Sequence, residues 1–289
     1  MIEFAIHLLI LSGIYAILAV SLNLVVGYTG LLSITHAAFY GLGAYVTALL
    51  LTVFGVNFFL SIIVGMIITA LVALLIGLVL SKFDGDYYAL VSFGFNIILF
   101  SVFLNWQEVT RGPLGIPGID KPSLFGFEFS GSFSFLILTF VLAGAVYLIG
   151  RYIVNSSFGR VLKAIREDEE AISVFGYNTL YFKLAIFVIA AALAAVGGSL
   201  FASYITFIDP STFTLLESIF ILAIIILGGL SNIRGAVLGA FLLIIIPELL
   251  RVVGFPSEIA AQMRQVLYGA ILILLMLYRP QGMIGEYKF

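Results

Sequence analysis

The sequence predicts an all-α, polytopic helical membrane protein that forms a single domain over residues 1–289. Hydrophobic residues make up 63% of the chain, charged residues only 10%, and the mean hydropathy is +1.23. A soluble domain carries about 25% charged residues. Apolar runs long enough to cross a bilayer as helices recur along the chain, and the alternating short strands of an outer-membrane barrel are absent.

The apolar runs divide into about nine expected transmembrane segments. They are Phe4–Val26, Ala37–Phe54, Phe58–Leu80, Tyr87–Leu104, Phe133–Tyr152, Phe182–Ile205, Phe213–Leu230, Gly235–Leu250 and Val266–Tyr278. The seventh and eighth runs are short and are flanked by Gly228-Gly229 and Gly235. These two runs are therefore either two full spans or one broken element.

The Lys and Arg residues in the connections predict the orientation, because cytoplasmic loops carry an excess of them. If the most charged connection is cytoplasmic, the inner side holds Lys82, Arg151, Arg160, Lys163, Arg166, Lys183, Arg234, Arg279 and Lys288. The outer side then holds Arg111, Lys121, Arg251 and Arg264. This bias predicts an N-terminus outside and a C-terminus inside.

Two kinds of local pattern accompany these spans. Small residues recur every four positions at Ser61, Gly65, Thr69, Ala73 and Gly77, again at Ala190, Ala194 and Gly198, and at Gly235 and Gly239. Such stripes let neighbouring helices approach closely. The longest outer connection, residues 105–132, contains RGPLGIPGIDKP, whose Gly and Pro residues predict an irregular surface loop. That loop is either a simple connection or a contact for a soluble partner.

The charged segment (residues 156–176) differs most from the rest of the chain. Seven charged side chains lie within eleven residues: Arg160, Lys163, Arg166, Glu167, Asp168, Glu169 and Glu170. At the bilayer centre they would cost roughly 20 kcal/mol together. The segment must therefore lie in water beside the membrane. Four acids against three bases disfavour binding to anionic lipid, so docking onto a protein is preferred to a helix lying on the headgroups.

One continuous helix through this segment would place four consecutive acids in its middle and C-terminal half, where the helix dipole disfavours them. Two short helices separated near Glu167 remove the conflict. The expected boundaries are an N-cap at Ser156 or Ser157, a second N-cap at Asp168, a terminator at Gly176 and a cap of the next span at Thr179.

Signatures of catalysis are missing from the sequence. It contains no Cys, no P-loop, no H-E-x-x-H and no G-x-S-x-G. Asp84-Gly85-Asp86 is more typical of a turn than of a metal site, and there is no basic patch for nucleic acid. A non-catalytic protein without cofactor or metal is expected. A stand-alone secondary carrier and an intramembrane enzyme remain as less favoured alternatives.

Polar residues inside or next to the apolar runs are candidates for a translocation pathway, because such groups are costly in a membrane. They are Asn23, Asn96, Glu217 and Glu248, with Thr35 and His36 directly before the second run. Glu217 and Glu248 lie near the predicted outer ends of their runs. We expect Asn23, Thr35, His36 and Asn96 to line the pathway.

Ordered motifs over nearly the whole chain resemble one family. They are SLNLVVGYTGLLSITHAAFYGLGAY (Ser21–Tyr45), GDYYALVSFGF (Gly85–Phe95), TRGPLGIPGI (Thr110–Ile119), SSFGRVLKAIREDEEAISVFGYN (Ser156–Asn178), FIDPSTFTLLESIFILAIIILGG (Phe207–Gly229) and YRPQGMIG (Tyr278–Gly285). With them the chain resembles the permease subunits of ABC importers for branched-chain amino acids, in particular the LivM-type half.

The resemblance implies a multi-pass subunit of a prokaryotic cytoplasmic (inner) membrane. Its expected partners are a second homologous permease, two cytoplasmic ATPases that hydrolyse ATP, an extracytoplasmic substrate-binding protein and membrane lipid. Urea and short-amide importers have similar permeases, so these substrates are an alternative. Family members often carry an acidic residue in the fourth span where this chain has Phe95-Asn96.

The resemblance also implies roles for individual residues. The ATPase-coupling positions are Gly159, Arg160, Ala164, Arg166, Glu167, Asp168, Ala171 and Gly176. Arg111, Gly112 and Pro113 in the outer loop are candidates for contact with the binding protein.

Overall fold

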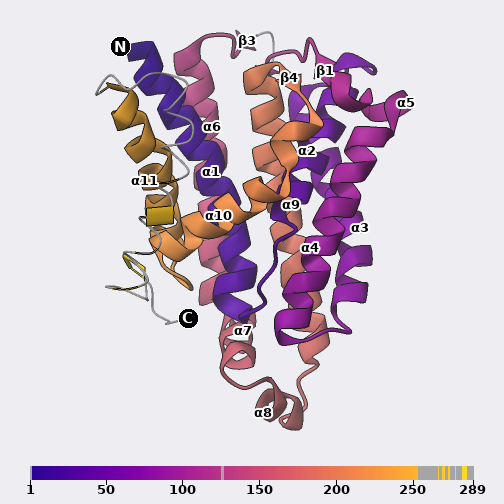
Figure 1. The fold of residues 1–289 in the computed structure, drawn as a ribbon, viewed down its shortest axis with the longest axis vertical. Coiled ribbons are helices and arrows are strands. Elements are labelled where there is room, and N and C mark those ends of the chain that lie inside the picture. Colours follow the sequence, from indigo (N-terminus) through magenta and orange to yellow (C-terminus); the bar gives the residue numbers. More distant parts are fainter. Residues whose placement is uncertain are drawn as a thin grey trace.

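The computed structural model is a bundle of long helices, and its described residues are 2–124, 127–252 and single positions between 266 and 284 (Figure 1). The helices are α1 (Ile2–Thr29), α2 (His36–Thr52), α3 (Phe58–Leu80), α4 (Gly85–Asn105), α5 (Gln107–Thr110), α6 (Ser132–Asn155), α7 (Ser157–Glu167), α8 (Glu169–Val174), α9 (Thr179–Ile205), α10 (Leu215–Gly228) and α11 (Ile233–Val252). The expected ninth span falls mostly outside the described residues.

Five described helices are long and apolar enough to cross a membrane: α1, α3, α4, α6 and α9. The helices α10 and α11 form one further candidate as a bent pair, and α2 is a shorter apolar helix. The chain is thus an all-α polytopic membrane protein, as the composition predicts.

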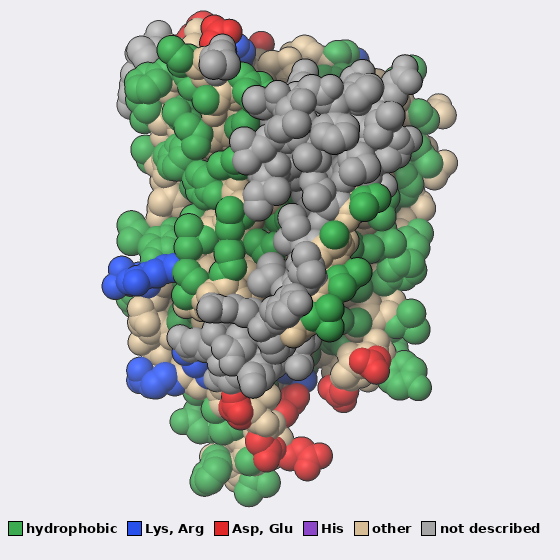
Figure 2. Space-filling view, turned by 60° about the vertical axis from the view of Figure 1, so that its left-hand side comes forward, with side chains coloured by type: hydrophobic (Ala, Val, Ile, Leu, Met, Phe, Trp, Pro, Cys, Tyr) green, Lys and Arg blue, Asp and Glu red, His purple; other side chains and the backbone are tan. Residues whose placement is uncertain are grey.

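The core of the bundle is formed by α1 and α9. In its most apolar stretch of 18 residues, α1 has 83% of its residues buried and α9 has 67%, against 33% or less for α3, α4 and α6. The helix α1 contacts α6, α9, α10 and α11, whereas α9 also packs on α2 and α3. The less buried helices present apolar side chains outward, as a lipid-facing surface requires (Figure 2).

The small-residue stripes lie at helix contacts, as predicted. Every residue of the stripe on α3 is buried, and α3 packs against α9 and α2. A Cβ atom added to Gly198 would lie 2.1 Å from the carbonyl oxygen of Tyr40, so α9 and α2 touch through their backbones. Close backbone approach of this kind is the usual basis of helix packing in membranes.

The bent pair of α10 and α11 resolves the open question about the seventh and eighth runs. The two helices meet at an angle of 119° across a break of a few residues. Gly229 (φ 115°) and Ser231 (φ 59°) form the turn, and the backbones of Gly228 and Gly235 lie in contact. The two runs therefore form one broken element, with α10 crossing the middle of the bundle (Figure 1).

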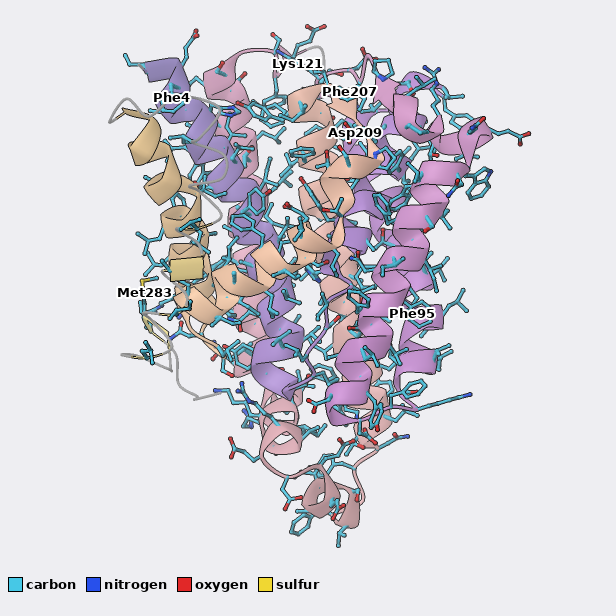
Figure 3. The ribbon with its side chains drawn as sticks, in the orientation of Figure 1. Phe4, Phe95, Lys121, Phe207, Asp209 and Met283 are labelled. Atoms are coloured by element: carbon cyan, nitrogen blue, oxygen red, sulfur yellow. The ribbon has the colours of Figure 1, made fainter. Side chains whose placement is uncertain are left out.

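Short strands and 3-10 helices close one end of the bundle. They are η1 (Gly112–Leu114), β1 (Ile116–Pro117), β2 (Ser123–Leu124), β3 (Phe127–Glu128), β4 (Phe207–Ile208) and η2 (Pro210–Phe213). Antiparallel pairing of β1 with β4 ties the loop after α4 to the connection after α9. Lys121, Phe207 and Asp209 mark this end in Figure 3.

The charged segment lies at the opposite end of the molecule. The helices α7 and α8 extend below the bundle. The first turn of α1 lies at the top of the bundle, at the same end as β1 and β4 (Figure 1). Acidic side chains gather at the end formed by α7 and α8 (Figure 2). The amide of Met283 donates to the carbonyl of Leu227 at 2.9 Å, so residues 282–284 lie against the end of α10 (Figure 3).

Candidate functional site

The two helices predicted for the charged segment are confirmed, with the predicted caps. The Ser156 hydroxyl accepts from the amide of Gly159 at 3.3 Å and starts α7. Asp168 (φ −157°, ψ 98°) ends α7, and its carboxylate accepts from the amide of Ala171 at 2.9 Å to start α8. Gly176 follows α8 with φ 88°, a conformation that favours Gly.

The predicted cap of the next span is wrong by one residue. Asn178, and not Thr179, caps α9: the Asn178 side chain accepts from the amide of Tyr181 at 3.2 Å. Thr179 is already the first helical residue. Both residue types can cap a helix, so the sequence alone did not distinguish them.

Arg166 points from α7 into the bundle and not toward solvent. Its guanidinium group donates to the carbonyl of Gly27 near the end of α1 and, at 2.7 Å, to the hydroxyl of Ser231. The Ser231 hydroxyl itself donates to the same Gly27 carbonyl. One side chain thus connects α7 with the end of α1 and with the turn between α10 and α11.

Buried contacts fix α7 to the membrane helices at further points. Leu162 and Ile165 are buried. A Cβ atom added to Gly159 would lie 2.3 Å from the carbonyl oxygen of Val154, so α7 begins in backbone contact with the end of α6.

Lys183 on α9 provides the connection to α8. Its ammonium group, largely buried, lies 2.8 Å from a carboxylate oxygen of Glu169 and 3.7 Å from one of Asp84. Glu169 is therefore part of the attachment of α8. This role of Lys183 was missed at the level of sequence, where the residue was only counted as an inner charge.

The remaining side chains of the segment form an exposed surface. Arg160, Glu167, Asp168 and Glu170 are exposed, and Val174 and Phe175 at the tip are 85% and 77% exposed. Beside them is a groove of about 520 Å³ whose lining residues come from α7, α8 and the start of α9: Ser157, Phe158, Arg160, Val161, Ala164, Ile172, Tyr177, Tyr181 and Phe182. An apolar groove rimmed by charges is typical of a protein contact.

The eight coupling positions suggested by the resemblance thus differ in their surroundings. Arg160, Glu167, Asp168 and Gly176 are exposed, and Ala164 lines the groove. Gly159 and Arg166, by contrast, hold α7 against the bundle. Ala171 is part-buried and supplies the amide that Asp168 caps.

A second group of polar residues lies inside the bundle and includes three of the four pathway candidates. We call Ser21, Thr35, His36, Ser92, Asn96 and Ser218 the polar cluster; all six are buried. They come from α1, the start of α2, α4 and α10. Phe95, next to Asn96, shows their level on α4, between the middle of the bundle and the end that carries α7 (Figure 3).

Hydrogen bonds link the members of the polar cluster across four helices. A ring nitrogen of His36 lies 2.7 Å from the Ser21 hydroxyl. The Ser218 hydroxyl accepts from the amide of Ala37 and from the side chain of Asn96, both at 2.9 Å. The Ser92 backbone carbonyl accepts from Thr35 at 3.3 Å. The cluster therefore joins the start of α2 to α1, α4 and α10.

The side-chain oxygen of Asn96 has no hydrogen-bond partner within the described residues, although Asn96 is fully buried. A buried acceptor left unpaired costs about 1–3 kcal/mol. Ser92 and Ser218 were missed in the sequence, where isolated Ser residues in apolar runs resemble small packing residues. The spacing of Ser92 and Asn96, four positions apart on one helix face, was the available signal.

Asn23, the fourth pathway candidate, is not part of this cluster. Its amide group donates to the carbonyl of Asn232 at 3.0 Å, and its oxygen accepts from the amide of Ser231 at 3.1 Å. Asn23 thus holds the turn between α10 and α11, directly beside the contact of Arg166 with Ser231.

The predicted binding-protein contacts, in the loop after α4, lie at the end opposite to α8. Arg111 (φ 58°) and Pro113 are exposed, whereas Gly112 is buried with its Cα facing the carbonyl of Leu104. Leu114 beside them is 82% exposed. Among the described positions, no three His, Asp or Glu side chains lie together as a metal site requires.

Comparison with known proteins gives a consistent result. The family model described as "Branched-chain amino acid transport system / permease component" matches residues 4–276. The high-affinity branched-chain amino acid transport system permease proteins LivM of Salmonella typhimurium and of Escherichia coli are each 35% identical, over 95% of this chain and 68% of theirs. LivH of Salmonella typhimurium is 27% identical over 96% of this chain and 92% of its own.

No solved structure matches the chain. The family match nevertheless extends over almost all of the sequence, from the first turns of α1 through the charged segment and the bent pair. The chain therefore belongs to the family of branched-chain amino acid transport permease components.

Proposed function

We propose that this chain is the transmembrane permease subunit of an ATP-driven importer for branched-chain or other apolar amino acids. The observation that carries this proposal is the charged segment: α7 and α8 project from the bundle with an exposed charged surface, while Arg166 and Lys183 join them to four membrane helices. A projecting element fixed to the bundle can pass the motion of a docked partner to the membrane helices.

The proposed assembly contains two homologous permease subunits in the cytoplasmic membrane, two cytoplasmic ATPases and an extracytoplasmic binding protein. The ATPases would dock on the exposed residues of the charged segment and hydrolyse ATP, so this chain itself is not catalytic. The binding protein would contact the opposite end near Arg111, Gly112 and Pro113. The family membership and the relatives named LivM and LivH support two related permeases.

The function is tested by uptake into liposomes that contain the reconstituted complex, with binding protein outside and ATP inside. We expect leucine uptake that requires ATP, and no uptake of urea. Uptake of urea without leucine would reject the proposed substrate class. Uptake by this chain alone, driven by an ion gradient, would instead identify a secondary carrier.

We further propose that the nine apolar segments, with α10 and α11 as one bent pair, place the N-terminus outside and the C-terminus inside. The chain contains no Cys, so single Cys variants have no background. A membrane-impermeant maleimide should label Leu114→Cys in intact cells and Val174→Cys only after permeabilisation. These sites are matched in exposure, at 82% and 85%. The reverse pattern would invert the topology. Cross-linking of Leu114→Cys to the binding protein tests the outer contact.

We propose the polar cluster as part of the translocation pathway, with Asn96 as a group that becomes accessible when the helices around the start of α2 separate. Its unpaired oxygen could accept a hydrogen bond from the substrate ammonium group, an interaction with a charged partner worth about 1.5–3 kcal/mol. Asn23 lies at the turn of the bent pair, so it would influence transport by holding that turn and not by touching substrate.

Replacing Asn96 by Leu is expected to lower leucine uptake by roughly 10- to 100-fold, the rate equivalent of that hydrogen bond. Leu has a similar size, and it removes both the unpaired acceptor and the hydrogen bond that Asn96 donates to Ser218. These two changes act in opposite directions, so thermal stability should change little. Thr69→Val is the matched control, because Thr69 is also buried and unpaired but lies on the packing stripe of α3. Equal uptake by the Asn96 and Thr69 variants would contradict the pathway role.

A further inference from the structure

A groove with one polar and one apolar part is lined by residues of α1, α6 and α11. The polar part, of about 330 Å³, is lined by Tyr28, Tyr147, Arg151, Val154, Asn155, Lys163, Ser231, Asn232, Ile233 and Arg234. The apolar part, of about 430 Å³, is lined by Gly13, Ala16, Val20, Phe140, Ala143, Gly144, Tyr147, Arg234, Val237, Leu238 and Phe241. Tyr147 and Arg234 line both parts, so the two are continuous.

The polar part carries a concentrated positive charge. Arg151 and Arg234 are exposed, and within the described part of the chain neither guanidinium group makes an ion pair. Lys163 lies at the same place with its ammonium group 5.5 Å from the centre of the Tyr28 ring. Basic side chains gather at one edge of the face shown in Figure 2, just above the acidic end of the molecule.

The dimensions of the groove match those of one lipid molecule. The fifteen residue steps from Gly13 to Tyr28 on α1 correspond to about 22 Å at 1.5 Å per residue. One leaflet contributes about 15 Å of hydrocarbon, and the headgroup occupies the remaining length. The polar part lies at the end that carries α7, and the apolar part extends from it toward the middle of the bundle.

We propose that this groove binds one anionic phospholipid of the inner leaflet, with its phosphate between Arg151 and Arg234 and an acyl chain against Val20, Gly144 and Leu238. Basic pockets between membrane helices on the cytoplasmic side recognise such headgroups. The site contacts the start of α11 and the end of α6, next to the turn that Arg166 holds. Lipid bound there would stabilise the arrangement of α7, α6 and the bent pair.

Photo-crosslinking tests this proposal on the full chain with its partner subunits, in phosphatidylcholine nanodiscs. A small fraction of the lipid carries a diazirine on its acyl chain, with either a phosphatidylglycerol or a phosphatidylcholine headgroup. Crosslinked peptides from Gly13–Val20 and residues 140–147 are then quantified. We expect the phosphatidylglycerol probe to label them more strongly, by about fivefold for each basic side chain that contacts the headgroup.

The variants Arg151→Gln and Arg234→Gln should each reduce this preference, and the double variant should remove it. Lys82→Gln is the control, because Lys82 is an exposed cation on the turn between α3 and α4, outside the groove. Equal labelling by both probes in the unmodified protein would overturn the proposal. Absence of labelling of these peptides with both probes would also overturn it.

Discussion

Reversing the charge of Glu167 is expected to weaken binding of the ATPase subunits strongly while the permease stays folded. Glu167 is the exposed last residue of α7, and within the described part of the chain its carboxylate makes no hydrogen bond or ion pair with the bundle. An attractive charge at an interface becomes a repulsive one on change to Lys, and like charges facing each other cost several kcal/mol. We expect about 100-fold weaker association, equivalent to about 2.7 kcal/mol.

Asp168 requires a different substitution from Glu167, because its carboxylate caps α8 through the amide of Ala171. Asp168→Lys would remove the cap, at a cost of about 1 kcal/mol, together with the charge. Asp168→Asn removes the charge and keeps a side-chain oxygen for the cap. The variants Glu167→Lys and Asp168→Asn therefore change the charge of the docking surface without removing the cap of α8.

Co-purification of the ATPases with the permease variants measures the effect, and the amount of permease in the membrane controls for insertion. Asp86→Lys is the matched control, since Asp86 is an exposed acid at the same end but outside the charged segment. If Glu167→Lys and Asp86→Lys lower association equally, the effect comes from general charge repulsion and not from the loss of a docking contact. If neither lowers it, the charged segment is not the contact surface.

The charged segment could be predicted in detail from sequence because its constraints are local. Seven charges are too costly to place in lipid, and the helix dipole favours a run of acids only near the N-terminus of a helix. From these facts and the residue types that cap helices, the sequence predicts a break near Glu167, a cap at Ser156 or Ser157 and a second cap at Asp168. The structure contains the break, with caps at Ser156 and Asp168. The direction of the Arg166 side chain could not be predicted, because its partners Gly27 and Ser231 are far away in sequence.

The polar cluster also shows that contacts between distant parts of the chain could not be predicted from sequence. Thr35, His36 and Asn96 stood out as polar groups in apolar runs, and they do lie near one another. Their connecting partner Ser218 is more than 120 residues away from Asn96 in the chain. Periodicity predicts which face of a helix is apolar, but it does not predict which helices are neighbours.

The bent pair was left open by the sequence for a related reason. Glycines at positions 228, 229 and 235 permit a sharp turn, but they equally permit close packing of two full spans. The structure contains both features at once: a 119° bend and backbone contact between Gly228 and Gly235. The angle depends on the neighbours of the turn, namely Asn23 and Arg166, which hold the Ser231 backbone and side chain.

Replacing Arg166 by Gln is expected to separate ATP hydrolysis from transport. The guanidinium group joins α7 to the end of α1 and to the turn of the bent pair, through the carbonyl of Gly27 and the hydroxyl of Ser231. Hydrogen bonds to a charged group contribute about 1.5–3 kcal/mol each. The helix α7 should stay in place, because Leu162, Ile165 and the close contact at Gly159 remain.

The expected result for Arg166→Gln is therefore normal association of the ATPases and measurable ATP hydrolysis, with leucine uptake reduced by at least about tenfold, the equivalent of one such bond. Ser231→Ala removes one acceptor and leaves the Gly27 carbonyl, so its effect should be smaller. In the double variant the losses should be less than additive, because both changes remove the same contact. Additive losses would show that Arg166 and Ser231 act independently, and unchanged uptake in Arg166→Gln would reject the proposed link between the charged segment and the bent pair.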